Sequence, residues 1–477
     1  MTRAARLLLT AALLACAAPA SAQVTTPPAP LPLRPYRMPE VRRTTLPNGV
    51  LVVVVEQPAL PIVTARLIAD AGAMFEPADK SGLALLTAEM LREGTGTLSG
   101  PDIAARMERL GASFVTAGSF SLAQEQITAI PSAFPAAFEL ATETFTSPSF
   151  PASEFTRVQR IALAGYEQAM AQVEGIAPRI FQKALYDEAS PFSRSPSGTA
   201  ATLSTITRED VVAWHRTNYL SSSTIALFVG DIRFDDAVAL AQRTLGRWQA
   251  GASPDRAVSA DPMRASGARV ILVDRPGSSQ SAIYVGGKGV GGGDPNIVPM
   301  TALQHVLGGG ASSRANMNLR ERNGYTYGAF SDFTTLRGTG WLAIASSVRT
   351  DATAPALAEA LKEYKRIIEE DIPQDEWAAG VNNLIASFPS SVQTVQGLAE
   401  RVQRLLLYGL PLDFYATYRE KLAAVTPRQA QQVGRAVMPV GAPTLVAVGD
   451  LSQIEQPIRA LGLGAVEVWD REGKKLR

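Results

Sequence analysis

The sequence predicts an α+β protein of two structurally similar α/β halves, each a mostly antiparallel sheet covered by helices. The chain has 477 residues, more than the ~250–300 at which a single core stops growing, so more than one domain is expected. Apolar residues make up 46% of it and charged residues 19%, which is typical of a packed globular protein. A repeated pattern of strand and turn motifs supplies the third observation.

Two landmarks recur at nearly the same spacing. Leu51–Glu56 (LVVVVE) resembles Arg269–Asp274 (RVILVD), and residues 227–231 (LFVGD) resemble residues 446–450 (VAVGD). The spacings are 274 − 56 = 218 and 450 − 231 = 219 residues. Because unrelated strand and turn pairs have no reason to share a spacing, we interpret the second half as a duplicate of the first.

The first 22 residues have the features of an export signal. Arg3 and Arg6 precede a largely apolar run at residues 7–18, and residues 20–22 (ASA) form a small-residue cleavage site. The run is shorter than the ~20 residues that span a bilayer. The sequence therefore predicts cleavage and a periplasmic mature protein.

The single cysteine, Cys16, lies inside this signal. Residues 13–16 (LLAC) loosely resemble a lipoprotein box, but the bulky Leu14 and the better downstream site favour cleavage over lipidation. A cysteine-free mature chain relies on its core and not on disulfides. Removing two arginines leaves 43 Lys and Arg against 44 Asp and Glu, and this balance does not suggest a nucleic-acid partner.

The rest of the chain divides by composition. Six prolines between Val24 and Pro39 predict an extended tether, and the turn Pro47-Asn48-Gly49 is expected to start the folded part. The predicted divisions are a signal peptide (1–22), a Pro-rich tether (23–43), a first half (44–248), a linker (249–268) and a second half (269–477).

Individual elements follow from local patterns. β-branched apolar runs predict strands, and Gly, Pro and Ser at the ends of apolar runs predict helix limits; Ser81 is the expected N-cap of a helix that ends before Gly94. The predicted strands are 50–55, 63–68 and 225–229, and the predicted helices are 81–91, 102–110, 135–144, 155–173 and 355–368.

Residues 319–328 (LRERNGYTYG) combine a charged helix end, an Asn-Gly turn and two tyrosines two residues apart. If the tyrosines lie in a strand they share a face, and Arg320 projects from the preceding helix over it. A guanidinium and a phenol there could hold a peptide carbonyl or an oxyanion. On this stretch alone, a helix-capping arginine with two packing tyrosines is the favoured interpretation.

Residues 82–95 (GLALLTAEMLREGT) resemble the active-site helix of the pitrilysin/insulinase family of zinc metallopeptidases, roughly G-L-A-H-F-L-E-H-M-L-F-x-G-T. Its H-x-x-E-H motif supplies two zinc ligands and a glutamate that activates water. Here Leu85 and Glu89 replace the histidines and Ala88 replaces the glutamate. A further glutamate ligand would fall near residues 164–166, where Glu167 is out of register. The chain has two histidines, His215 and His305, and they are not four residues apart, so H-x-x-E-H cannot occur elsewhere.

The resemblance extends over most of residues 40–455. Further matching segments are 190–199 (SPFSRSPSGT), 209–219 (EDVVAWHRTNY) and 307–321 (LGGGASSRANMNLRE). The family also has an arginine followed by a tyrosine seven residues later, and Arg320 and Tyr327 match this pair. The resemblance implies that Arg320 binds the substrate backbone and that Tyr327 donates a hydrogen bond to the tetrahedral oxyanion.

The resemblance implies a clam-like chain and a function. Some family members are heterodimers in which one chain holds zinc and the other does not. This chain is then expected to hold no metal and to be the non-zinc subunit, acting with an H-x-x-E-H partner of similar length on peptides. The alternative is an inactive peptide-binding or scaffold protein of the same fold. A hydrolase with another nucleophile has no support, because the mature chain has neither cysteine nor G-x-S-x-G.

Overall fold

The computed structural model describes residues 37–249, 251, 256, 263–264 and 268–477. The predicted signal peptide, most of the tether and much of the linker lie outside the described residues. Within the described ranges, none of the helices combines the length and apolar character needed to cross a membrane.

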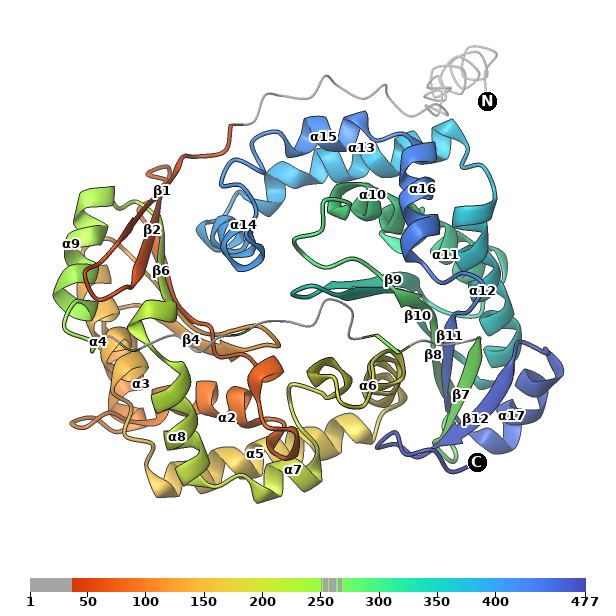
Figure 1. Cartoon of the computed structure of the whole chain (residues 1–477), viewed down its shortest axis with the longest axis horizontal. Coiled ribbons are helices and arrows are strands. Elements are labelled where there is room, and N and C mark those ends of the chain that lie inside the picture. The colour runs from red at the N-terminus through yellow and green to blue at the C-terminus, as the bar shows by residue number, and fades with distance from the viewer. Residues whose placement is uncertain (1–36, 250, 252–255, 257–262, 265–267) are drawn as a thin grey trace, which may run out of the picture. The chain divides into compact units, whose positions relative to one another are not determined.

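The first half forms a six-stranded mixed sheet (Figure 1). Its order is β1-β2-β6-β3-β5-β4, and only the β2–β6 pair is parallel. Four consecutive valines make β2 a strand whose side chains are buried on both faces. The strands are β1 (Val41–Thr45), β2 (Leu51–Glu56), β3 (Val63–Ala69), β4 (Ser113–Gly118), β5 (Ala123–Ala129) and β6 (Thr224–Gly230).

The second half repeats this sheet. Its order is β12-β7-β11-β8-β10-β9, in which the pairing from β7 to β9 has the same directions as that from β2 to β4. The sixth strands differ, because β1 is antiparallel to its neighbour and β12 is parallel. The strands are β7 (Arg269–Asp274), β8 (Gln280–Lys288), β9 (Ala329–Thr335), β10 (Gly340–Arg349), β11 (Thr444–Gly449) and β12 (Ala465–Trp469). The predicted fold of two similar, mostly antiparallel halves is confirmed.

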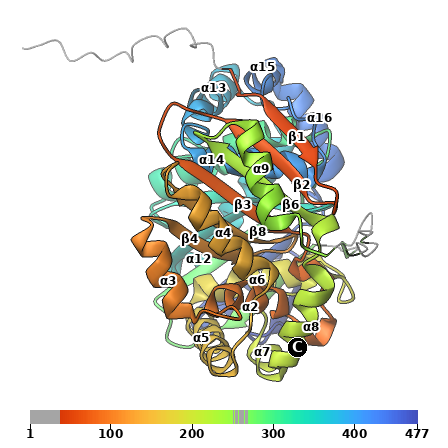
Figure 2. The same cartoon turned by 90° about the vertical axis from the view of Figure 1, so that its left-hand side faces the viewer.

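Helices cover each sheet. Figure 2 shows α4 and α9 lying across one face of the first sheet. The helices of the first half are α2 (Leu83–Met90), α3 (Gly100–Arg109), α4 (Phe134–Thr146), α5 (Ala152–Met170), α6 (Val173–Leu185), α7 (Ala200–Thr205), α8 (Arg208–Asn218) and α9 (Phe234–Leu245). Those of the second half are α10 (Ile297–Gly308), α11 (Arg314–Asn316), α12 (Thr353–Glu369), α13 (Gln374–Ser391), α14 (Val395–Tyr408), α15 (Tyr418–Ala424), α16 (Pro427–Val437) and α17 (Leu451–Ala460).

The two halves exchange one helix each. Helix α6 packs on β8 and β11 of the second sheet, where the Phe181 ring lies 5.3 Å from that of Tyr284. Helix α14 packs on β3 and β6 of the first sheet, where the buried Arg66 donates from Nη1 to Glu400 (2.8 Å) and Gln403 (2.6 Å). The starts of α6 and α14 are 395 − 173 = 222 residues apart, close to the repeat spacing. Each sheet is thus buried on both faces.

Three expected limits differ from the structure. The helix predicted over 155–173 ends at Met170, and Val173 instead begins α6. The folded part begins before Pro47, because β1 already pairs with β2; residues 41–43 therefore belong to the sheet and not to the tether. Helix α2 is not capped by Ser81, whose hydroxyl donates to the carbonyl of Ser195. Instead the backbone N–H groups of Gly82 and Ala84 donate to the buried carboxyl of Glu76. Burial raises the pKa of Glu76 to about 8, against the opposing effect of these two donors.

Candidate functional site

Two of the three motif positions on α2 line a cavity of about 380 Å³ between α2 and α5. Leu85 and Glu89 face it, whereas Ala88 is fully buried in the first core. From α5, Gly165 faces the same cavity, and Glu167 does not line it. We call this space the α2–α5 cavity; its lining is Gly82, Leu85, Leu86, Glu89, Ile161, Ala162, Gly165, Tyr166, Ala169, Arg179, Ser197 and Leu203.

These residues do not fit a zinc ion. A structural or catalytic zinc site needs at least three nitrogen, sulfur or carboxylate ligands from the protein. Glu89 is the only carboxylate that lines the α2–α5 cavity, and the other two facing positions carry leucine and glycine. Across the described residues, no group of three His, Cys, Asp or Glu could hold a metal. His215 on α8 and His305 on α10 do not line this cavity.

Arg320 lies in a π-helical segment, Met317–Arg322, that continues α11. Such segments are rare and frequently occur at functional sites. The Arg320 side chain is about half exposed (48%), and its Nε lies 3.2 Å from the carboxylate of Glu321. The segment ends where the N–H of Gly324, at φ 63°, donates to the carbonyl of Arg320 (2.9 Å).

The expected strand through Tyr325 and Tyr327 is wrong, because β9 begins two residues later at Ala329. Thr326 explains the difference. Its hydroxyl donates to the carbonyl of Ser347 on β10 (2.6 Å) and accepts from the N–H of Gly328 (3.1 Å), which holds residues 326–328 in a loop. Tyr325 packs against the second core, whereas Tyr327 is 93% exposed. The two tyrosines therefore do not share a face.

The loop that carries Tyr327 is fixed on both sides. The N–H of Arg349 donates to the carbonyl of Tyr325 (3.2 Å), and the Ser346 hydroxyl donates to that of Gly328 (2.9 Å). The neighbours of Tyr327 are thus bonded to β10 while its own side chain extends into solvent. Rigid presentation of an exposed phenol suits a group that donates to a ligand.

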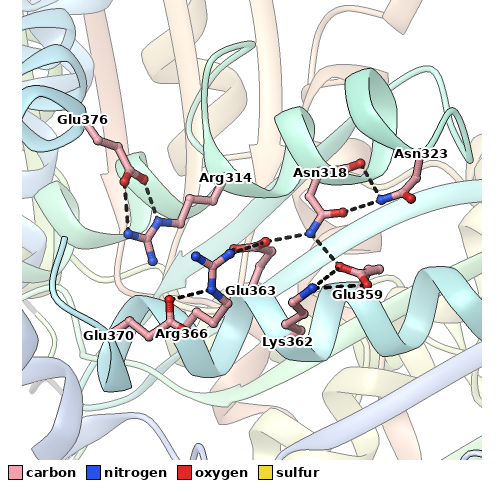
Figure 3. A network of polar contacts seen from close by, with 9 residues as sticks. All are labelled: Arg314, Asn318, Asn323, Glu359, Lys362, Glu363, Arg366, Glu370 and Glu376. Atoms are coloured by element: carbon pink, nitrogen blue, oxygen red, sulfur yellow. Dashed lines mark hydrogen bonds and ion pairs between the residues drawn. The ribbon is translucent and has the colours of Figure 1, made fainter. Parts of the chain in front are cut away.

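A polar network holds the π-helical segment on α12 and α13 (Figure 3). Arg314 donates from Nε (2.6 Å) and Nη2 (3.0 Å) to the two oxygens of Glu376. The Asn318 amide donates to Glu359 (2.8 Å) and Glu363 (2.6 Å), and its carbonyl accepts from Asn323 (2.6 Å). This network sets the direction in which the segment presents Arg320.

Three cations face four carboxylates in the network. Arg366 donates to both oxygens of Glu363, whose side chain is 2% exposed. Burial raises the pKa of Glu359, but hydrogen bonds from Asn318 and Lys362 outweigh it, and this pKa lies below its ordinary value. The asparagine amide therefore lies between two carboxylates, one of them deeply buried.

Asn318 was not identified from the sequence, and Gly165 was placed only within residues 164–166. Gly165 is one turn from other small or apolar residues that face the cavity, Ile161 and Ala169, and this helical spacing could have identified it. Asn318 carries no comparable signal. Its role depends on Glu359 and Glu363, which lie four apart on one face of a helix some 40 residues later in the sequence.

Asn318→Leu is expected to lower the free energy of unfolding by about 2–3 kcal/mol, because it leaves buried acceptors on Glu363 without their amide donor. The midpoint of urea unfolding measures this. The matched control is Glu321→Gln in the same segment, which is exposed and should change stability by less than about 0.5 kcal/mol. Equal midpoints for the two variants would show that the network does not stabilise the segment.

Two family descriptions match the chain, over consecutive regions. "Insulinase (Peptidase family M16)" matches residues 51–193, and "Peptidase M16 inactive domain" matches residues 205–384. An uncharacterized zinc protease of Mycobacterium tuberculosis is 24% identical over 88% of this chain and 96% of its own length. A non-peptidase homolog from Helicobacter pylori is 21% identical over 78% of this chain and 86% of its own length.

A solved structure has the same fold. The peptidase M16 inactive domain from Pseudomonas fluorescens matches with a TM-score of 0.81 and 25% identity, over 86% of this chain and 98% of that one. The matched regions include α2 with its replaced motif and the segment that carries Arg320 and Tyr327. The chain belongs to the peptidase M16 (insulinase) family, and its residues 205–384 match that family's inactive domain.

Proposed function

We propose that this chain is the non-zinc subunit of a periplasmic heterodimeric metallopeptidase. The partner chain carries H-x-x-E-H and the zinc ion, which polarises the substrate carbonyl and activates water. This chain contributes Arg320, which binds the substrate backbone, and Tyr327, which donates to the oxyanion. The export signal at residues 1–22 supports the location.

One observation carries the proposal. Tyr327 is 93% exposed on a loop whose neighbours are hydrogen-bonded to β10, in a chain whose α2–α5 cavity cannot hold zinc. A tyrosine that only packs would be expected to contact a core, as Tyr325 does. Large apolar side chains are also exposed on the flanking segments, at Met317 (43%) and Phe330 (48%). Exposed apolar side chains of this kind suit a surface that a partner or a peptide covers.

The sheet next to this loop supports a peptide as substrate. Strand β9 starts at Ala329, directly after the loop, and it is the edge of the second sheet. An extended peptide can add to such an edge through main-chain hydrogen bonds. It would then pass beside Tyr327 and Arg320, where a carbonyl can accept from the phenol and the guanidinium.

Peptide cleavage by this chain alone and mixed with a zinc-bearing partner chain tests the proposal. The purified mature chain alone should not cleave a quenched fluorescent peptide at any zinc concentration. Adding an exported M16 chain with an intact H-x-x-E-H should produce cleavage that a chelator abolishes, together with a complex on size-exclusion chromatography. A complex whose cleavage rate equals that of the partner alone would instead support a scaffold role. Chelator-sensitive cleavage by this chain alone would overturn the proposal.

A further inference from the structure

A second cavity, of about 300 Å³, adjoins the α2–α5 cavity. The two share Tyr166 of α5 and Arg179 of α6. We call the second space the basic pocket, because four cations line it. Its lining is Ala78, Ser81, Tyr166, Met170, Arg179, Ile180, Lys183, Glu188, Ser193, Arg194, Ser195, Thr199, Thr202, Arg471 and Glu472.

Three of these cations, Arg179, Lys183 and Arg194, have no carboxylate within 4 Å among the described residues. Arg179 donates to the carbonyl of Gly198 (3.0 Å) and to Ser197 (2.6 Å), which uses two of its five N–H groups. Arg194 has one long contact, 3.5 Å, with the carbonyl of Glu76. Burial lowers the pKa of both guanidinium groups, so each pays a desolvation cost that no neighbouring carboxylate offsets at contact distance.

The other charges of the basic pocket largely cancel. Lys183 donates to the carbonyl of Glu472 (3.0 Å), and Arg471 pairs with the carboxylate of Glu472 (2.9 Å). Glu188 also lines the pocket. The lining therefore carries four cations against two acids, a net charge of +2. This excess of positive charge suits an anion such as a carboxylate.

Most of the residues that line the neighbouring α2–α5 cavity are apolar. Its side chains include Leu85, Leu86, Ile161 and Ala162. A Cβ atom added at Gly165 would meet no heavy atom within 4 Å, so this wall is open. The space beside Gly165 therefore leaves room for an apolar side chain of a bound ligand.

We propose that the basic pocket and the α2–α5 cavity form one binding site for the carboxyl terminus of a peptide that ends in an apolar residue. The terminal carboxylate binds Arg179 and Arg194, and the last side chain enters the space beside Leu85 and Gly165. Carboxyl-terminal capture by fixed donors is an established mode of peptide recognition. The site uses neither Arg320 nor Tyr327 and needs no partner chain, so it stands or falls separately from the subunit role.

Fluorescence anisotropy of the mature chain alone tests this site. The probe is an N-terminally labelled alanine peptide that ends in leucine, as the free acid and as the C-terminal amide. The free acid should bind at least ~10-fold more tightly, because the amide loses charge-assisted hydrogen bonds. Arg194→Gln and Arg179→Gln should each weaken free-acid binding by at least ~10-fold. Arg216→Gln, an exposed arginine on α8, should leave it unchanged.

Gly165→Leu tests the apolar part of the site. The added Cβ meets no heavy atom within 4 Å, and the substitution replaces a helical glycine, so it should block the peptide while the melting temperature is kept or raised. Equal affinity for acid and amide would overturn the proposal, as would full binding by Gly165→Leu. Octanoate that competes as well as the unlabelled peptide would overturn the peptide assignment in favour of carboxylates in general.

Discussion

Tyr327→Phe is expected to lower kcat of the assembled peptidase by about 10²–10³-fold, the cost of removing one oxyanion donor. The complex should still form, and KM should change little, because the hydrogen bond is made to charge that develops in the transition state. The measurement is steady-state hydrolysis of a quenched fluorescent peptide with the zinc partner in excess.

Structural damage cannot account for such a loss. The Tyr327 side chain is 93% exposed, and the loop is held by the bonds of Thr326 and Gly328 to β10. Phenylalanine would occupy the same place without the hydroxyl group. Unfolding curves of the two proteins should therefore superimpose, since exposed substitutions away from special contacts change stability by less than about 0.5 kcal/mol.

Tyr325→Phe is the matched control, because it removes the same group two residues away. Tyr325 packs against the second core and is not presented to solvent as Tyr327 is. This variant should keep the wild-type kcat. If Tyr327→Phe also keeps it in a complex that cleaves peptide, the oxyanion role assigned to Tyr327 is wrong.

The repeat was predictable because strands carry local signals. Val52 to Val55 form a buried strand in the first half and residues 270–273 form its counterpart in the second, and the shared spacing of two strand ends predicted the duplication. The exchange of α6 and α14 was not predictable. An amphipathic pattern shows that a helix buries one face, but it does not show whether its own sheet or the other half's sheet covers that face.

Details of the candidate site depended on contacts between distant segments. The pattern of Tyr325 and Tyr327 predicted a strand, but the hydroxyl of Thr326 binds the carbonyl of Ser347 and keeps the loop out of the ladder. Likewise, Ser81 is of a residue type that often caps helices, but the carboxyl of Glu76 accepts the hydrogen bonds from the first backbone N–H groups of α2. Neither result follows from propensity, because the deciding partner is set by the fold.

The substituted motif positions can be tested by restoring a metal site. Leu85→His, Glu89→His and Gly165→Glu together are expected to bind one zinc ion per chain, whereas the natural chain binds none at this site. At a free zinc concentration of 1,000 times Kd, the ion should stabilise the folded protein by about 4 kcal/mol. Calorimetric titration measures the stoichiometry, and thermal unfolding with and without zinc measures the stabilisation.

Zinc binding is expected because Leu85, Glu89 and Gly165 all line the α2–α5 cavity. Leu85 and Glu89 are four residues apart on α2, so two imidazoles there lie on one helical face. A side chain at Gly165 enters open space from α5 and can supply a carboxylate from the opposite wall. Two nitrogens and one oxygen leave the fourth position of a tetrahedral zinc ion for water.

A variant with the same three ligand types in a different arrangement is the control. Gln168→Glu replaces Gly165→Glu in it, because Gln168 is exposed on α5 and does not line the cavity. This control should bind zinc more weakly and gain less stability. Equal binding by both variants, or none by either, would contradict the assignment of Leu85, Glu89 and Gly165 to the substituted zinc site.

Zinc binding alone should not restore hydrolysis. The family motif also needs a glutamate that activates the bound water, and Ala88 stands in its place, fully buried in the first core. Ala88→Glu would put a carboxylate among apolar side chains, which is costly unless the new zinc ion or a water molecule compensates it. We therefore expect the three-residue variant to bind zinc and to cleave no peptide, which separates loss of the metal from loss of the base.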